Sequence, residues 1–465
     1  MSTSFITISF ILVVLDLVAC MIIAYKTNGS SKNSEDYFIG GKKTGTVLLL
    51  LTAWASFSGA GNFIGQAGRG TLYGINAYWL WIGESLLGGI VMGVIIAPYL
   101  AQFRYVSMPH YIANHLCGGD HYVRRVSGLA ALMPNLVWPG AQIMGISYVL
   151  DQVFGIDYRI AAIICGIVLV VHTTTGGINA VIYADALHGV IQMIFAGLVV
   201  FFGLKMFHFD WGYLKESVIS VDPSKWDMFI DNPMYIATSF FTGFVGATSN
   251  PIFWNRAFAA KDVQTARKSY GITFFFNIIL VFLIITIGIA VIPLNSAAGD
   301  QSLVWAILNK MPSFVGIFLC VGVFAACMSC ADTHLNCAAA NIISDIIDPD
   351  GKIEPVKSVK YAKIATSIAG TVSILCAIFA DYIYALGTYG YTICGGVLIP
   401  IFVVGLLMKG KMKVRSAQIG ITLGLIVALL FEIVPSLSAI LGGGVIPAII
   451  ATTLGICIPN MIIKE

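Results

Sequence analysis

Apolar runs of about 20 residues recur from one end of this chain to the other, and each could cross the ~30 Å hydrocarbon core of a bilayer as a helix. Of its 465 residues, 58% are hydrophobic and 11% are charged, which leaves too little polar surface to cover a soluble fold. The net charge is +3 and forms no basic stripe of the kind that binds nucleic acid. We therefore expect an all-α integral membrane protein that is embedded in the lipid bilayer and has no nucleic-acid partner.

These runs predict about thirteen transmembrane helices. The first run lacks a basic n-region and a cleavage site, so we interpret it as a span and not as a signal peptide. With the N-terminus outside, 20 of the 26 lysines and arginines, Arg256 among them, fall on the cytoplasmic side, which is the positive-inside pattern. We expect a multi-pass protein of the plasma (inner) membrane with a cytoplasmic C-terminus. The spans are predicted near residues 4–25, 44–70, 75–101, 126–154, 158–175, 180–205, 233–254, 269–294, 312–347, 360–380, 382–408, 415–434 and 436–462.

The second span is interrupted by glycine and hydroxyl residues between positions 52 and 68. An unpaired backbone group in lipid costs several kcal/mol, so a helix broken at membrane depth must line a site that is buried in protein or wet. The freed carbonyls can then bind a cation. The alternative is an unbroken helix whose glycines let a neighbouring helix approach closely.

A second unusual stretch, residues 323–336, places small and polar residues in the middle of an apolar helix. Ala326, Ser329 and Cys330 are spaced i, i+3 and i+4, so they share one helix face. A hydroxyl on an intact helix and carbonyls from a broken one could together replace the hydration shell of a monovalent cation. The alternative is a small-residue helix interface in which Ser329 bonds to its own backbone.

Four stretches in this order resemble the sodium:solute symporter family, whose members share the fold of the bacterial leucine transporter. Residues 35–42 resemble the family's entry to its second helix. Residues 176–192 resemble its G-G-x-x-A-V-x-x-T-D-x-x-Q signature, with Ala184 where threonine is usual. The remaining two stretches, at 250–261 and 325–332, resemble its N-Q-x-x-x-Q-R-x-L-A-A-K and A-A-x-M-S-S-x-D motifs.

The resemblance implies one polytopic transporter domain, 1–465, built from two inverted five-helix repeats. The first repeat, spans 2–6, covers about 44–205, and the second, spans 7–11, covers about 233–408. Helices 2 and 7 are broken at the substrate site. The extra helices are 4–25, 415–434 and 436–462. The implied function is secondary active transport, with no enzymatic activity: sodium, the coupling ion, would drive symport of a small organic solute by alternating access.

The resemblance also assigns residues to the two sites. Asp185 matches an acid near the exit of the ion. Cys330 stands where a ligand hydroxyl is usual, and a thiol is a poor ligand for a hard cation. The expected sodium site is formed by Ala55, Ser58, Ala326, Ser329 and Cys330. The expected substrate positions are Asn62, Trp81, Glu84 and Asn250.

The identity of the solute stays open at this point. Glu84 lies three residues from Trp81, and an acid beside an aromatic ring suits an ammonium group, so an amino acid or a choline-like cation is favoured. A carboxylate or sugar carrier is an alternative, although the eighth span has no charge of the kind that sugar carriers use. A proton-coupled carrier that relays protons through Asp185, Glu84 and Asp332 is another. An active site made of Cys327, Asp332 and His334 is not expected, because these residues lie on one helix. The sequence leaves the oligomeric state open.

Overall fold

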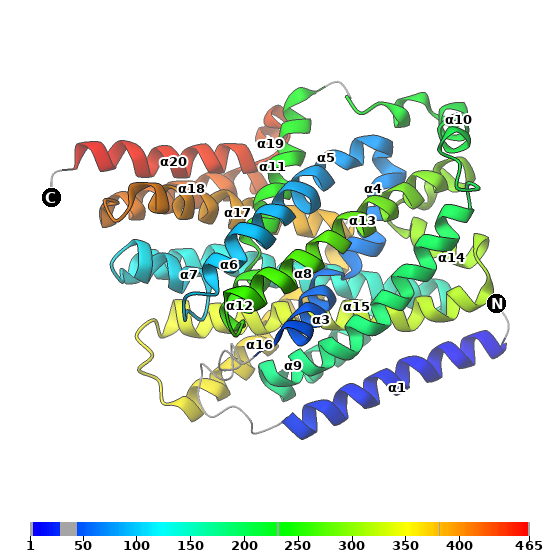
Figure 1. Cartoon of the computed structure of the whole chain (residues 1–465), viewed down its shortest axis with the longest axis horizontal. Coiled ribbons are helices and arrows are strands. Elements are labelled where there is room, and N and C mark those ends of the chain that lie inside the picture. Colours follow the sequence, from blue (N-terminus) through cyan, green and yellow to red (C-terminus); the bar gives the residue numbers. More distant parts are fainter. Residues whose placement is uncertain (1–2, 28–43, 230–231, 381, 464–465) are drawn as a thin grey trace.

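In the computed structural model, the described residues (3–27, 44–229, 232–380 and 382–463) fold almost entirely into helices (Figure 1). Five short π-helical segments and three 3-10 segments join or extend the α-helices, and one π-helical segment, Gly61–Gly65, lies between α3 and α4. The α-helices are α1 (Thr3–Thr27), α3 (Thr46–Phe57), α4 (Gln66–Tyr73), α5 (Tyr78–Trp81), α6 (Ala97–Leu100), α7 (Met108–Tyr111), α8 (His121–Phe154), α9 (Tyr158–Lys205), α10 (Trp211–Val221), α11 (Pro233–Ser249), α12 (Pro251–Ala259), α13 (Val263–Asn295), α14 (Ser302–Lys310), α15 (Ser313–Ala340), α16 (Pro355–Phe379), α17 (Ile383–Met408), α18 (Val414–Ile433), α19 (Pro435–Leu441) and α20 (Val445–Ile462).

Ten helical segments of the described chain are long and apolar enough to cross a membrane. Two of the thirteen predicted spans are built from shorter helices instead: the second, which α3 begins with 12 residues, and the seventh, made of α11 and α12. The predicted fifth and sixth spans lie on one continuous helix, α9. The second and the seventh are the spans that were predicted to be broken.

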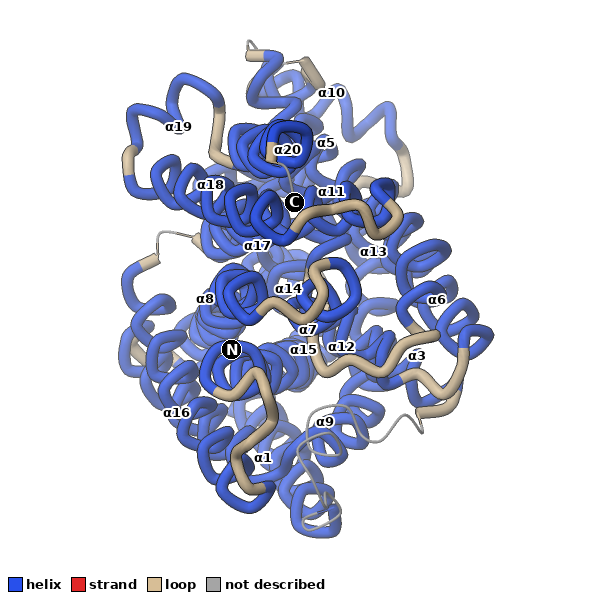
Figure 2. The backbone as a smooth tube through the Cα atoms, turned by 90° about the vertical axis from the view of Figure 1, so that its left-hand side faces the viewer, coloured by secondary structure: helices blue, strands red, loops and turns tan. Residues whose placement is uncertain are grey.

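The helices are layered around a buried centre (Figure 2). The most apolar windows of α8, α15 and α17 are each 78% buried, whereas the corresponding windows of α1 and α20 are only 17% and 28% buried. In both views α1 and α20 lie at opposite sides of the molecule (Figures 1 and 2). The outer helices therefore turn apolar side chains toward lipid, and the central helices carry the polar residues considered below.

The first break follows α3. Ser58 leaves the helical conformation with φ −86° and ψ 53°, and a π-helical turn starts at Gly61. A Cβ atom at Gly59 would lie 2.4 Å from Gln142 Oε1 and 2.9 Å from Cys330 Cβ, so only glycine fits against α8 and α15 here. The Ala60 amide donates to Gln142 Oε1 at 2.7 Å. Side-chain capping from α8 thus satisfies a backbone group that the break exposes.

The second break separates α11 from α12. Asn250 has φ −58° and ψ 118°, and Pro251, which has no amide hydrogen to donate, starts α12. The Asn250 side chain caps the new helix by accepting a bond from the Ile252 amide at 3.2 Å. The Thr248 carbonyl accepts a bond from the Trp254 indole at 2.8 Å. Both predicted breaks are therefore present, and each is stabilised by local hydrogen bonds.

Candidate ion and solute sites

The structure brings the two unusual stretches of the sequence together. The first break packs directly on α15 through Gly59 and Cys330. One side chain of α9 also bridges the two helices, because Gln192 Nε2 donates to the Ala55 carbonyl at 3.2 Å and to the Ala325 carbonyl at 3.4 Å. The break after α3 and the middle of α15 therefore meet, with Gln192 of α9 beside them.

This region contains oxygen atoms without partners. Ser58 Oγ and Gln192 Oε1 are buried, and neither atom has a hydrogen-bond partner among the described residues. A buried polar atom without a partner costs about 1–3 kcal/mol, so such atoms call for a ligand. Oxygen is the donor that a hard cation such as sodium prefers, and the carbonyl of Ala55 keeps a second lone pair. The residues present therefore fit a sodium ion, with Cys330 supplying the one soft atom.

Asp185 lies at the centre of a polar network beside this region. Its carboxylate accepts bonds from the hydroxyls of Ser329 at 2.5 Å, Thr52 at 2.6 Å and Ser56 at 3.0 Å. Arg256 Nη2 completes the network at 2.5 Å from Asp185 Oδ2. Both charged side chains are buried, so the network joins α3, α9, α12 and α15 through strong, desolvated contacts.

Arg256 is the main residue of this network that sequence analysis missed. It had been counted among cytoplasmic basic residues, but it is only 4% exposed. Besides the ion pair, its guanidinium donates to Thr52 Oγ1 at 3.1 Å and to Thr333 Oγ1 at 2.8 Å. Its place inside the motif at 250–261, beside the second break, was the available signal. Gln192 was missed in the same way, at the end of the stretch 176–192.

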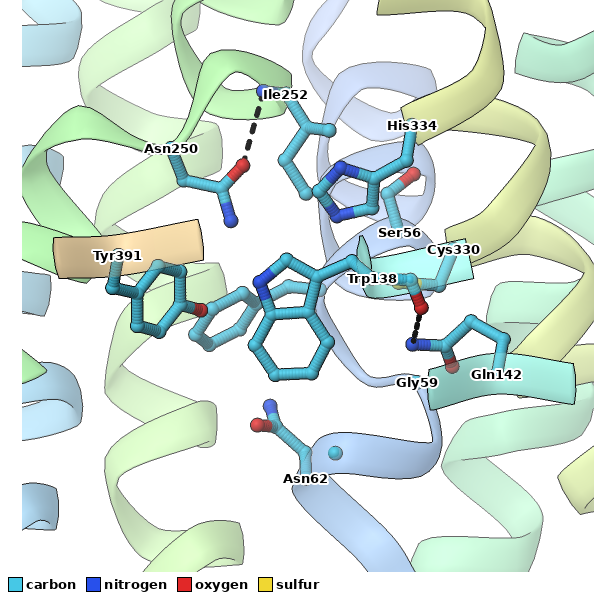
Figure 3. Close-up of a pocket in the computed structure, with 12 residues that line it drawn as sticks. Ser56, Gly59, Asn62, Trp138, Gln142, Asn250, Ile252, Cys330, His334 and Tyr391 are labelled. Atoms are coloured by element: carbon cyan, nitrogen blue, oxygen red, sulfur yellow. Dashed lines mark hydrogen bonds between the residues drawn. The ribbon is translucent and has the colours of Figure 1, made fainter. Parts of the chain in front are cut away.

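A cavity lies between the two breaks (Figure 3). Its volume is about 20 Å³, which is room for about one water molecule and too little for an organic solute in this structure. Trp138 stands in the middle of the view, with Asn250 and His334 on one side of it and Asn62 on the other. None of the lining residues is an aspartate, glutamate, lysine or arginine. They are Ser56, Phe57, Gly59, Gly61, Asn62, Trp138, Gln142, Asn250, Ile252, Cys330, His334 and Tyr391.

Two of the four predicted substrate residues line this cavity and two do not. Asn62 and Asn250 lie on it. Trp81 instead packs against Phe282 and donates its indole N–H to the Ile278 carbonyl at 3.1 Å. Neither Trp81 nor Glu84 is among the residues that line this cavity.

Glu84 does not line the cavity itself but contacts Tyr391, which does. Its carboxylate accepts bonds from Tyr384 at 2.5 Å, Gln66 at 3.1 Å and Tyr391 at 3.1 Å. The three contacts hold the Glu84 carboxyl group between α4 and α17. Because Tyr391 lines the cavity, Glu84 fixes the orientation of a wall residue.

Asp332, another buried acid, does not join Cys327 and His334 in a catalytic arrangement. Its carboxylate pairs with His172 Nδ1 at 2.8 Å and accepts a short bond from Thr173. His334 Nδ1 contacts Asn135 Oδ1 at 2.8 Å. The acid and the imidazole are thus directed to different helices.

Comparison with known proteins places this geometry in a family. The model of the sodium:solute symporter family matches residues 37–424. The human sodium/iodide cotransporter is 24% identical over 416 residues, which cover 82% of this chain and 62% of the cotransporter. A sodium/proline symporter of Staphylococcus aureus is 21% identical over 385 residues, covering 79% of this chain and 75% of that protein.

Solved structures show the same fold. A Na⁺-coupled sialic acid symporter in a substrate-bound, outward-open state superposes with a TM-score of 0.78 at 18% identity, over 98% of both chains. The nucleobase-cation-symport-1 transporter Mhp1 in a closed conformation gives a TM-score of 0.55 at 16% identity, over 91% of this chain and 93% of Mhp1. These comparisons confirm the predicted fold class, and the family and its relatives agree with sodium as the coupling ion. The chain belongs to the sodium:solute symporter family.

Proposed function

We propose that this protein is a sodium-coupled symporter of a small organic solute without net charge. The observation that carries the proposal is the break of α3 at Ser58, whose buried hydroxyl has no partner among the described residues and whose neighbour Gly59 packs on Cys330 of α15. Sodium would bind there, held by Ala55, Ser58, Ala326 and Ser329. The ion would fix α3 against α15 and favour the state that binds solute.

The energy for transport would come from the ion. One positive charge moving inward gains about 2.3 kcal/mol per 100 mV of membrane potential, in addition to its concentration gradient. Alternating access would arise from rocking of the first repeat, about 44–205, against the second, about 233–408. The Asp185 and Arg256 pair joins these two proposed repeats, so it would have to separate when the ion leaves toward the inside.

Besides the Asp185 and Arg256 pair, a second contact between the two proposed repeats would close the route from the sites to the cytoplasm. The start of α3 lies beside the end of α12, where the Lys261 amide donates to the Thr44 carbonyl at 3.3 Å. Sequence predicts that both ends are cytoplasmic. We therefore interpret the Thr44 contact and the Asp185 pair as two layers of an inner gate.

The solute class follows from the cavity walls. An ion with net charge would have no opposite charge to meet among the lining residues, and burying an unpaired charge is expensive. The amides of Asn62 and Asn250 can donate and accept hydrogen bonds, and the Trp138 indole N–H is buried without a partner among the described residues. These groups favour a neutral or zwitterionic solute, such as an amino acid, over a choline-like cation, a carboxylate or an organic anion.

Uptake into proteoliposomes tests the proposal. Purified protein would be given a mixture of labelled amino acids, sugars, quaternary amines and carboxylates, with an inward gradient of sodium or of protons in separate arms. We expect uptake of a solute without net charge that needs sodium and is enhanced by a negative interior. Uptake driven by a proton gradient with no sodium requirement would instead support the proton-coupled alternative and reject this proposal.

A further inference from the structure

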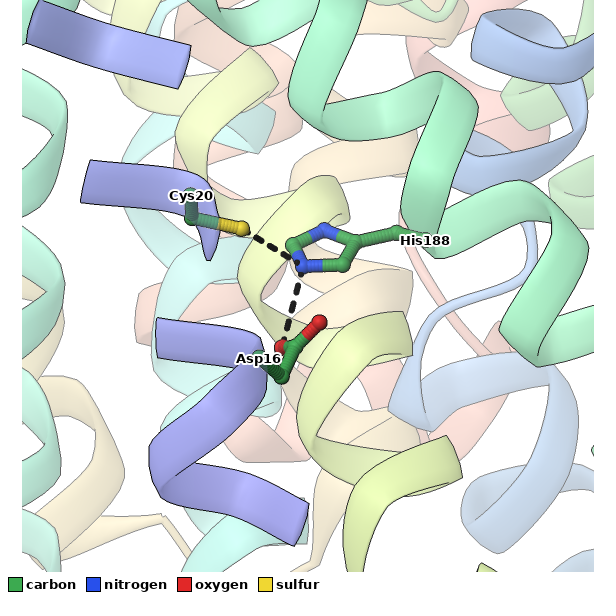
Figure 4. A group of neighbouring side chains, drawn as sticks. All are labelled: Asp16, Cys20 and His188. Atoms are coloured by element: carbon green, nitrogen blue, oxygen red, sulfur yellow. Dashed lines mark hydrogen bonds and ion pairs between the residues drawn. The ribbon is translucent and has the colours of Figure 1, made fainter. Parts of the chain in front are cut away.

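Three potential metal ligands meet between α1 and α9, outside the sites described so far (Figure 4). Asp16 and Cys20 lie on α1 with i, i+4 spacing, so they share one helix face. His188 faces them from α9. One donor atom from each residue lies within 4.8 Å of the other two, and the three residues are 6%, 1% and 0% exposed.

Hydrogen bonds within this cluster do not satisfy all of its polar atoms. His188 Nε2 lies 3.2 Å from Asp16 Oδ2 and 3.2 Å from Cys20 Sγ. A ring nitrogen carries at most one hydrogen, so it cannot make a good bond to both partners. Asp16 Oδ1 is buried with no partner among the described residues. Two partners for one nitrogen and an unpaired carboxylate oxygen both indicate that something else belongs at the centre of the cluster.

The donor set indicates which ion fits. Imidazole nitrogen, thiolate sulfur and carboxylate oxygen are the three ligand types of zinc, whose sites often place two ligands one helical turn apart. Sodium and magnesium prefer oxygen alone, so this cluster and the proposed sodium site differ in chemistry. Three protein ligands leave one position of a tetrahedral ion for water or another small ligand.

We propose that Asp16, Cys20 and His188 form a site for Zn²⁺ or a similar divalent transition-metal ion that fastens α1 to α9. On binding, Cys20 releases its thiol proton and His188 binds as neutral imidazole through Nε2, with its hydrogen on Nδ1. Nδ1 has no acceptor among the described residues, so this site lacks the outer hydrogen bond that strengthens zinc sites about 10- to 100-fold. We therefore expect reversible binding.

The location gives the ion a structural consequence. Helix α1 contributes little buried surface of its own, with 17% of its most apolar window buried. His188 lies three residues after Asp185 on α9, so one segment of α9 faces the ion-site network and also the cluster. Metal binding would thus hold α1 to the helix that carries Asp185.

The test uses the full-length protein in detergent, stripped with a chelator and then equilibrated with Zn²⁺ or Co²⁺. We expect about one zinc per chain by mass spectrometry, and a thiolate-to-cobalt charge-transfer band that disappears in Cys20→Ser. His188→Gln places the glutamine of the family signature at this position, and we expect it to weaken zinc binding at least about tenfold. Zinc should raise the melting temperature of the unmodified protein and have no such effect on either variant.

Two control variants exclude adventitious binding. Cys457→Ala removes a half-buried thiol on α20, on the opposite side of the molecule from α1. His121→Gln removes an exposed imidazole that lies 2.9 Å from Asp350 at the surface. Both should bind zinc normally. Two results would overturn the proposal: no zinc binding at all, or zinc binding that is lost in His121→Gln and unchanged in His188→Gln and Cys20→Ser. Neither result bears on sodium-coupled transport.

Discussion

The most informative single substitution in this protein is Arg256→Gln. It removes the ion pair to Asp185 and the bonds to Thr52 and Thr333, all inside the protein. Leaving one partner of a buried pair uncompensated costs about 3–5 kcal/mol. In the variant, Asp185 keeps the three hydroxyl donors of Thr52, Ser56 and Ser329. We therefore expect the free energy of unfolding to fall by about 3 kcal/mol, the lower end of that range.

A double-mutant cycle isolates this pair. Unfolding in mixed micelles would be measured for Arg256→Gln, Asp185→Asn and the double variant. We expect the double variant to lose less stability than the sum of the single losses, with a coupling free energy of about 1.5–3 kcal/mol, because each single variant already breaks the pair. If the loss of stability in the double variant equals the sum of the two single losses to within about 0.5 kcal/mol, Arg256 and Asp185 do not interact strongly, and the proposed gate contact is refuted.

A second buried pair serves as the matched control. Arg124 Nε lies 3.2 Å from Asp345 Oδ1, and both side chains are buried. We expect Arg124→Gln to destabilise the protein without changing sodium coupling. Arg256→Gln should in addition allow sodium to leak in the absence of solute, because it weakens the inner gate. Equal sodium leak in the two variants would argue that Arg256 has only a structural role.

Three further substitutions test the two sites. Ser329→Ala removes a proposed ligand oxygen and should weaken the apparent sodium affinity in uptake assays about tenfold, or about 1.4 kcal/mol. The control Ser147→Ala removes a buried hydroxyl that is bonded to its own helix, α8, and should leave the sodium affinity unchanged. Cys330→Ser replaces the soft thiol by a hydroxyl and should increase the sodium affinity; an unchanged affinity would indicate that this position does not face the ion. Glu84→Gln replaces the carboxyl group that holds Tyr391, so the apparent solute affinity should fall several-fold in competition assays while the sodium dependence stays the same.

The sequence predicted the features that depend on local chemistry. Glycine and hydroxyl residues in an apolar run predicted the break near Ser58, because they act within one turn of a helix. The family resemblance implied the second break, which the structure places at Asn250 and Pro251. The meeting of α3 with α15 was predicted through the family resemblance. Asn62 and Asn250 were expected at one site for the same reason, and they line one cavity.

Contacts between distant helices were harder to predict. Arg256 was interpreted as a cytoplasmic charge because a count of basic residues does not show that a carboxylate lies 71 positions away in sequence and 2.5 Å away in space. The side chains of Trp81 and Glu84 were expected to share a face from their spacing. A π-helical segment starts at Ile82, however, which changes the angular spacing of neighbouring residues.

Direct sodium binding tests the central claim most simply. Purified protein would be equilibrated with radioactive sodium, and saturable binding would be compared with that of the Ser58→Ala and Ser329→Ala double variant. If sodium is held between the break of α3 and the facing side of α15, the double variant should lose saturable binding and keep its fold. Saturable binding of equal affinity in the double variant would contradict the account.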